Sequence, residues 1–303
     1  MKEILVILGN GFDLALGMNT SYKNFYQNKE FWPFGKKNNS DMTIRYMKGL
    51  DTFLDDNMQE NWYNLENLLA DYATNIKTVS PEQVEHDLQC FKKLKSSLSS
   101  FIDKEQRSLN RIYSSTKAVK FLDAIFENRR PIIYTFNYTA LDIIAEMLEH
   151  KDISYTAVHG SILGKDIVLG IEDNLDIPRE YDFLKKVSEP TYESSNLFYD
   201  LIKAKEVVFF GHSLGKNDYH FFRQFFKIHS DESNINPENK CKITFFTANS
   251  NSRMDILANL RAMNEGKNNQ LFAQNDLRFI RTLDEDRKAR EGFDKWIDDL
   301  KIK

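Results

Sequence analysis

Short apolar runs of strand length recur along the 303 residues of this chain, and segments with apolar residues at helical spacing separate several of them. The runs are Ile4–Leu8, Pro131–Phe136, Tyr155–Val158, Ile167–Ile171, Val207–Phe210, Ile243–Thr247 and Leu277–Thr282. Several are nearly continuous in hydrophobicity, which is typical of strands buried on both faces of a parallel sheet. The helical segments are Leu141–Leu148, Phe221–Phe226 and Met254–Leu260. This alternation predicts a doubly wound, mostly parallel α/β sheet.

Residues 41–128 break the alternation, because no convincing strand pattern lies among them. Apolar side chains recur there at helical spacing, in Trp62–Tyr72 and in Leu88–Ile102. Periodicity of this kind predicts amphipathic helices. We therefore expect a large all-helical insertion over residues 41–128, with residues 1–40 and 129–303 forming the α/β nucleotide-binding domain.

Charge and cysteine content narrow the classes of partner. The formal net charge is −4, so nothing attracts the chain as a whole to nucleic acid or to an anionic membrane. No apolar run approaches the roughly 20 residues of a membrane span. Cys90 and Cys241 are too far apart for a C-x-x-C zinc ribbon or a disulfide framework. We expect a cytoplasmic protein without a metal site, a membrane partner or a nucleic-acid partner; a homo-oligomer is compatible with the sequence.

The segment Gly-Asn-Gly-Phe-Asp at 9–13 directly follows the first apolar run, and a helix is expected to begin at Leu14. A glycine turn between a strand and a helix brings backbone N–H groups close to a phosphate. A standard dinucleotide fingerprint would have a third glycine where Leu14 stands, and an acidic residue about 20 positions on at a strand end. Only Glu30 is near that position, and no strand pattern surrounds it. The residues expected to contact a nucleotide are Gly9, Asn10, Gly11, Phe12 and Asp13.

Two polar residues stand where predicted strands end: Asn137 and His159. Open α/β sheets bind their ligands at the carboxyl ends of the strands. Taken singly, Asn137 also suits the N-cap of the next helix, and a lone histidine is often structural. Taken together, Asn137 would orient a hydroxyl or a water molecule, and His159 would accept its proton at neutral pH.

The segment Gly-His-Ser-Leu-Gly at 211–215 matches the G-x-S-x-G nucleophile elbow of α/β-hydrolases. That chemistry needs a histidine after the final strand. Only His220 and His229 follow Ser213, and both lie on the helix leaving the turn or just past it. We therefore predict that Ser213 is not a nucleophile. The turn instead suits a ribose or a phosphate, with contacts expected from Gly211, Ser213 and Leu214.

The order and spacing of these motifs resemble those of sirtuin-like proteins. The matching pieces are Gly9-x-Gly11 with Gly17, Thr135-x-Asn137-Tyr138, His159-Gly160 and Gly211-x-Ser213-Leu214. In sirtuins the two glycine turns cradle NAD, and the Thr-x-Asn and His-Gly residues surround the nicotinamide ribose. The resemblance implies a sirtuin-like, Rossmann-type core. Sirtuin deacylases also carry a four-cysteine zinc module, which two distant cysteines cannot build.

Fuller forms of the motifs resemble the AbiH family of bacterial abortive-infection proteins against phage, over nearly the whole chain. They are Gly-Asn-Gly-Phe-Asp-Leu-Ala-x-Gly at 9–17 with Thr20-Ser21-Tyr22 and Phe25, Trp62-x-x-x-Glu66, and Gly-His-Ser-Leu-x-x-x-Asp at 211–218. The resemblance adds Thr20 and Asp218 as ligand contacts. For the pair Trp62 and Glu66, a core tryptophan and a solvated glutamate are the favoured interpretation.

Three of these assignments have structural alternatives. A carboxylate beside a pyrophosphate is repulsive, so Asp13 is expected to face ribose hydroxyls or to cap its helix. Asp218 is equally placed to contact ligand or to cap the helix that it precedes. Asn249 stands where the relatives contact adenosine, and it also suits an ordinary turn.

Together, the AbiH and sirtuin-like resemblances imply an anti-phage protein that hydrolyses NAD to nicotinamide and ADP-ribose, with Asn137 and His159 as its catalytic residues. NAD or a related nucleotide would be the substrate, and an unidentified phage component the trigger. Two alternatives stay open. One is a non-catalytic nucleotide-binding sensor or adaptor in phage defence, and the other is an ADP-ribosyltransferase. The intact Asn–His pair favours an enzyme over a sensor.

Overall fold

The computed structural model describes residues 3–35, 49–61, 65–77, 79–109, 116–150, 153–192, 196–234, 238, 240–283 and 286–301. The chain forms two compact units. The first comprises Met1–Met18, Leu109–Val158 and Ser194–Lys303, and the second comprises Asn19–Ser108 and His159–Glu193. Residues of the predicted insertion over 41–128 fall in both units. In the described part of the chain, no helix combines the length and the hydropathy needed to cross a membrane.

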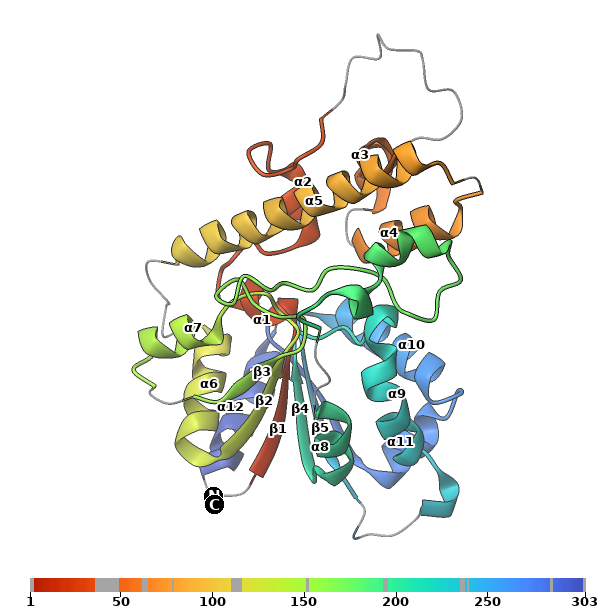
Figure 1. The fold of residues 1–303 in the computed structure, drawn as a ribbon. Helices are drawn as coiled ribbons and strands as arrows, with labels where there is room; N and C mark the ends of the chain where they lie inside the picture. Colours follow the sequence, from red (N-terminus) through yellow and green to blue (C-terminus); the bar gives the residue numbers. More distant parts are fainter. Residues whose placement is uncertain are drawn as a thin grey trace. The chain divides into compact units, whose positions relative to one another are not determined.

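The first unit contains a six-stranded sheet in which every neighbouring pair is parallel, which confirms the predicted fold class (Figure 1). The strands are β1 (Glu3–Leu8), β2 (Arg130–Thr135), β3 (Tyr155–Ala157), β4 (Glu206–Phe210), β5 (Lys242–Thr247) and β6 (Asp276–Arg281). Their order across the sheet is β3-β2-β1-β4-β5-β6. The chain therefore reverses its direction of travel between β1 and β4, and folds with this order bind dinucleotides at that reversal.

Helices cover both faces of the sheet, because successive side chains of a strand point to opposite faces. In β1, Ile4, Val6 and Leu8 belong to one hydrophobic cluster, whereas Leu5 and Ile7 belong to the other. The first cluster includes residues of α1 (Asn10–Ala15), α6 (Lys117–Asn128), α7 (Leu141–Met147) and α12 (Arg287–Lys301). The second includes residues of α8 (Leu197–Lys203), α9 (Tyr219–Ile228), α10 (Ser250–Met263) and α11 (Asn268–Gln274) (Figure 1). Burial on both sides explains the continuous hydrophobicity of the central strands β1, β4 and β5.

The second unit is mainly helical in its described residues. Its helices are α2 (Tyr22–Gln27), α3 (Leu50–Asn61), α4 (Leu65–Thr74) and α5 (Pro81–Arg107), with the short 3-10 helices η1 (Arg179–Leu184) and η2 (Lys186–Ser188). At the start of α5, the Ser80 hydroxyl accepts a hydrogen bond from the Gln83 N–H, and Pro81 occupies the first turn. Both are strong helix-start signals. The helical spacing seen in the sequence at 62–72 and 88–102 corresponds to α4 and α5.

Two expectations about single elements are wrong. The segment Ile167–Ile171 is buried but forms no strand. The Val168 N–H donates to the His159 carbonyl at 2.7 Å, and the Ile171 N–H donates to the Leu184 carbonyl at 2.8 Å. An apolar run of this length indicates burial and does not distinguish a strand from a buried loop.

The first helix begins at Asn10 instead of Leu14, because Gly9 is its extended N-cap residue and the glycine turn is its first turn.

Glycines let the ends of β1 and β4 meet backbone to backbone. A Cβ atom built on Gly11 would lie 2.7 Å from the Cα of Gly211, and one built on Gly211 would lie 2.4 Å from the carbonyl carbon of Gly11. A Cβ on Gly9 would lie 2.6 Å from the Cα of His212. Gly211 also has a φ of +67°, in the left-handed region that favours glycine. The first turn of α1 is therefore docked directly onto the turn that follows β4.

We predict that Gly211→Ala destabilises the protein by about 3 kcal/mol or more, because the methyl group would meet backbone atoms that cannot move aside and would sit at a positive φ. Gly292→Ala is the matched control. Gly292 lies inside α12 with open space at its Cβ position, and alanine there should raise stability by up to about 1 kcal/mol. Urea unfolding of both variants measures the difference. A Gly211→Ala protein within about 0.5 kcal/mol of wild type would show that this contact is dispensable.

Candidate functional site

The register of the sheet brings the ends of three strands side by side. Leu8 at the end of β1 pairs with Thr135 of β2 and with Phe210 of β4. The segments after these strands carry Gly9, Asn137 and Gly211, and all three lie at the carboxyl edge of the sheet. Doubly wound sheets bind their ligands at this edge. The fold thus brings together the residues that the sequence singles out after the first, second and fourth strands of the sheet.

The glycine amides at this edge are already paired with the protein. The Gly9 N–H donates to the Phe210 carbonyl and the Gly11 N–H donates to the Gly211 carbonyl, both at 3.0 Å. The Phe12 N–H donates to the Gly9 carbonyl at 2.8 Å. This differs from the expected phosphate cradle, in which such amides face the ligand. The glycines instead serve the close approach of two backbones.

Asn137 is held rigidly at the end of β2. Its side-chain Nδ2 donates to the Gly9 carbonyl at 3.1 Å and to an Asp13 carboxylate oxygen at 2.7 Å. Since both partners are acceptors, the orientation of the amide is determined. Asn137 does not cap α7, because the N-cap residue of that helix is Ala140.

The same orientation leaves the Asn137 Oδ1 atom buried, and among the described residues it has no hydrogen-bond partner. The residue as a whole is 5% exposed. A buried polar atom without a partner is costly, so native proteins rarely keep one without a ligand, a water or a function. The Asn137 Oδ1 is therefore a fixed acceptor for a hydroxyl or a water molecule.

Asp13 lies beneath this amide and is 1% exposed. Besides the Asn137 amide, its carboxylate accepts from the Thr139 hydroxyl at 3.1 and 3.0 Å. Asp13 lies inside α1, so it is not the N-cap residue, and its carboxylate is held by the Asn137 and Thr139 side chains. A buried carboxylate so close to the amide repels a phosphate, so the group that Asn137 suits best is a neutral hydroxyl or water.

His212 is a residue that the sequence analysis missed. It is 5% exposed and packs edge-on to the Phe136 ring, with 4.5 Å between ring centroids. Its Nδ1 accepts from the Leu214 N–H at 3.0 Å, which places the ring proton on Nε2. That Nε2 lies 3.4 Å from an Asp218 carboxylate oxygen. Its position between Gly211 and Ser213 was the available signal, but the G-x-S-x-G pattern leaves the identity of this residue open.

The other predicted contacts of the first unit lie in different surroundings. The Phe12 and Leu214 side chains lie in the two hydrophobic clusters, so only their backbones can face a ligand. Asn10 and Ser213 are exposed. Asn249 caps α10, since its Oδ1 accepts from the Ser252 N–H at 3.0 Å. Asp218 stands at the N-cap of α9 but makes no capping hydrogen bond there.

Two predicted site residues, His159 and Thr20, belong to the second unit. His159 and Thr20 are 5% and 8% exposed. Because Asn137 belongs to the first unit, its pairing with His159 across one cleft stays a prediction. Glu66 is not solvated as expected; it is 8% exposed and its Oε2 lies 3.2 Å from the Lys186 Nζ. Trp62 lies outside the described residues.

A family model described as "Bacteriophage abortive infection AbiH" matches residues 5–236 of the chain. The matched range begins in β1 and includes both glycine turns, Asn137, His159 and the His212–Asp218 pair. No curated protein and no solved structure gives a significant match.

We predict that Asp13 and Thr139 are energetically coupled. Asp13→Ala should cost about 2–4 kcal/mol, because it leaves the Asn137 amide and the Thr139 hydroxyl without their buried acceptor, at roughly 1–3 kcal/mol each. Thr139→Val removes one of these donors, so the double variant should be more stable than the sum of the single losses. A double-mutant cycle from urea unfolding measures this coupling. Losses that add within about 0.3–0.5 kcal/mol would contradict the contact.

We also predict that a fluorophosphonate probe leaves Ser213 unlabelled. Both ring nitrogens of the adjacent His212 are engaged, with Leu214 and with Asp218, so that ring offers no base to the serine hydroxyl. Intact-mass analysis after incubation gives the answer, with a known serine esterase as the positive control. Stoichiometric labelling at Ser213 would revive the hydrolase interpretation.

Proposed function

This chain belongs to the AbiH family of bacteriophage abortive-infection proteins, and we propose that it acts by hydrolysing NAD to nicotinamide and ADP-ribose. The observation that carries the proposal is the Asn137 amide. It is fixed by the Gly9 carbonyl and the Asp13 carboxylate, with its oxygen buried and without a protein partner among the described residues. It stands at the edge where sheets of this strand order bind dinucleotides.

NAD hydrolysis requires the protein mainly to position the reacting groups. Hydrolysis breaks the bond between the nicotinamide nitrogen and the anomeric carbon of the ribose, and it forms a bond from that carbon to a water oxygen. The leaving group is a cationic pyridinium that becomes neutral as it departs, so no general acid is needed. The protein must hold the ribose, place the water and accept one proton from it.

Asn137 fits the positioning role in this scheme. An amide oxygen that is already held in one orientation accepts a hydrogen bond from a ribose hydroxyl or from the attacking water without a further loss of side-chain conformational entropy. Asp13 would act through Asn137, as a positioning residue. We assign the proton-accepting role to His159, which follows β3 in the chain, because histidine is the side chain that most often acts as a general base. Loss of NAD would then halt the infected cell before phage could multiply.

The test is to incubate purified protein with NAD and to quantify free nicotinamide and ADP-ribose, with and without a lysate of phage-infected cells. His159→Ala should lower nicotinamide release by about 10²–10⁴-fold, the usual contribution of a positioned base, while NAD binding stays measurable. Asn137→Ala should lower it to a similar extent and weaken binding somewhat more. His150→Ala is the matched control, because His150 pairs with Asp123 in the α6–α7 region and not at the carboxyl edge.

Each alternative has its own signature in the same experiment. Consumption of NAD with ADP-ribose attached to a protein or to a nucleic acid, and no free ADP-ribose, would identify a transferase. Binding of NAD without turnover, combined with phage protection that survives His159→Ala, would identify a sensor. If the wild-type protein releases no nicotinamide even in the presence of infected-cell lysate, the proposal that it hydrolyses NAD is wrong.

A further inference from the structure

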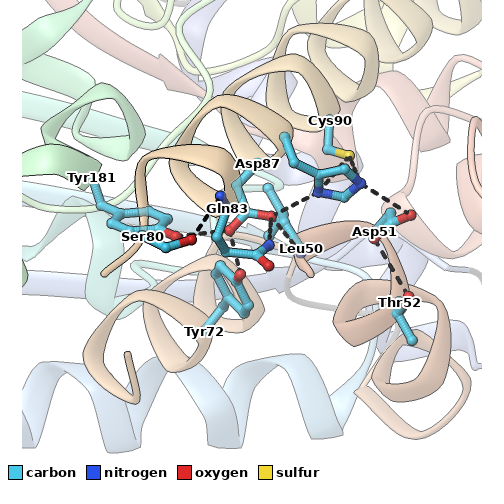
Figure 2. A network of polar contacts seen from close by, with 10 residues as sticks. Leu50, Asp51, Thr52, Tyr72, Ser80, Gln83, Asp87, Cys90 and Tyr181 are labelled. Atoms are coloured by element: carbon cyan, nitrogen blue, oxygen red, sulfur yellow. Dashed lines mark hydrogen bonds and ion pairs between the residues drawn. The ribbon is translucent and has the colours of Figure 1, made fainter. Parts of the chain in front are cut away.

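The second unit contains a polar network that is independent of the proposed NAD site. Its centre is Asp87 on α5, which is 0% exposed. One carboxylate oxygen accepts from the Leu50 N–H at 2.9 Å and from the Gln83 amide at 2.8 Å. The other accepts from the hydroxyls of Tyr72 and Tyr181 (Figure 2). Burial and the neighbouring carboxylate raise the pKa of both tyrosines, so both hydroxyls keep their protons and donate.

This network determines which nitrogen of His86 carries the proton. The His86 Nδ1 lies 3.2 Å from the Asp87 carboxylate. Because the other four partners of that carboxylate are donors, it acts as an acceptor, and the neutral ring places its proton on Nδ1. The Nε2 lone pair is then directed away from Asp87. A histidine whose Nδ1–H is held by a buried carboxylate is the arrangement that metal-ligating histidines show.

Two further ligand atoms lie near the ring. The Cys90 Sγ is 3.7 Å from the His86 Nε2 and 3.8 Å from Nδ1, so a rotation of this thiol or of the ring is needed to place it on the Nε2 side, and an Asp51 carboxylate oxygen is 3.9 Å from Nε2. Ligands at about 2.0–2.3 Å around a tetrahedral zinc ion lie roughly 3.3–3.6 Å apart. The nitrogen–oxygen separation is too long for a hydrogen bond, but it is within a few tenths of an ångström of what a shared ion requires. One candidate ligand atom from each residue lies within 4.8 Å of the others.

The backbone also accommodates this cluster. His86 and Cys90 are four residues apart on α5, so they share one face of that helix. Asp51 comes from the first turn of α3, directly after Leu50, whose N–H Asp87 binds. A Cβ on Gly49 would lie 2.9 Å from the His86 ring and 3.0 Å from the Asp51 carboxylate, so glycine is the residue that lets the two approach.

We propose that Asp51, His86 and Cys90 bind one Zn²⁺ ion through a carboxylate oxygen, Nε2 and a thiolate, with water as the fourth ligand. Aspartate, histidine and cysteine are all normal zinc ligands, and three protein ligands leave an open position. Binding releases the Cys90 thiol proton to solvent. The ion joins the start of α3 to α5. The proposal departs from the sequence expectation that no metal is bound, and it does not depend on NAD hydrolysis.

The test uses tag-free protein, stripped with a chelator and titrated with Co²⁺ and then with Zn²⁺. We expect one equivalent of Co²⁺ to give the visible bands of a tetrahedral site and a thiolate-to-cobalt charge-transfer band, and Zn²⁺ to displace it. Cys90→Ser should abolish the charge-transfer band. His86→Gln and Asp51→Asn should each weaken binding by at least about 10-fold, since losing even an outer partner of a metal ligand costs that much.

Cys241→Ala is the matched control. Cys241 is fully buried in the first unit, and burial raises the pKa of its thiol to about 12, so it is neither a ligand nor a reactive thiol. Native protein should therefore show one reactive thiol, at Cys90, whose alkylation Zn²⁺ slows. Thermal unfolding of the metal-free variants separates lost ligands from lost folding. No saturable Zn²⁺ binding, binding that survives both Cys90→Ser and His86→Gln, or alkylation that Zn²⁺ leaves unchanged would overturn the proposal.

Discussion

The backbone contact between Gly11 and Gly211 is the constraint on which the sheet unit depends. The contact has no room for a Cβ on either side, and it docks the first turn of α1 onto the turn after β4. It sits where the strand order reverses, between β1 and β4. A glycine motif of this kind is usually interpreted as a phosphate-binding loop. Here its two glycine amides are used to join the halves of the sheet.

The polar chemistry of the crevice follows from this docking. Because this contact fixes α1, the Asp13 carboxylate lies near the end of β2, where it accepts hydrogen bonds from the Asn137 amide and the Thr139 hydroxyl. The charge of Asp13 is costly to bury, and hydrogen bonds from the Asn137 amide and the Thr139 hydroxyl compensate for it. In return, Asn137 presents its oxygen in one orientation. A site built in this way recognises a hydroxyl or water by position and not by charge.

The second unit follows a similar rule with different residues. Asp87 joins α5 to the start of α3 through the Leu50 N–H, to α4 through Tyr72 and to η1 through Tyr181. In each unit, a buried carboxylate surrounded by donors orients a neighbouring side chain that has a lone pair to offer. The first presents the oxygen of Asn137, and the second presents the Nε2 of His86. Because each buried donor in these networks needs an acceptor in a defined position, the networks favour one arrangement of their side chains.

Much of the sheet follows from the sequence by itself. Six of the seven apolar runs are strands. In the central strands β1, β4 and β5, burial on both faces leaves a continuous apolar run that is visible in the sequence. Ile167–Ile171 shares that signature, yet its backbone partners are His159 and Leu184 of η1 and not a neighbouring strand, and composition does not specify partners. The sequence also marked Gly9, Asn137 and Gly211 as unusual, from residue type and from position after a strand.

Tertiary structure decided what these residues do. Asn137 was assigned as ligand contact or helix cap, and its actual partner is Asp13, 124 positions away. Asp51 and His86 show no motif, because their meeting depends on how α3 docks on α5 and on the missing side chain of Gly49. Hydrophobic periodicity is local and can be read along the chain, whereas a hydrogen bond between distant segments depends on how every element between them packs.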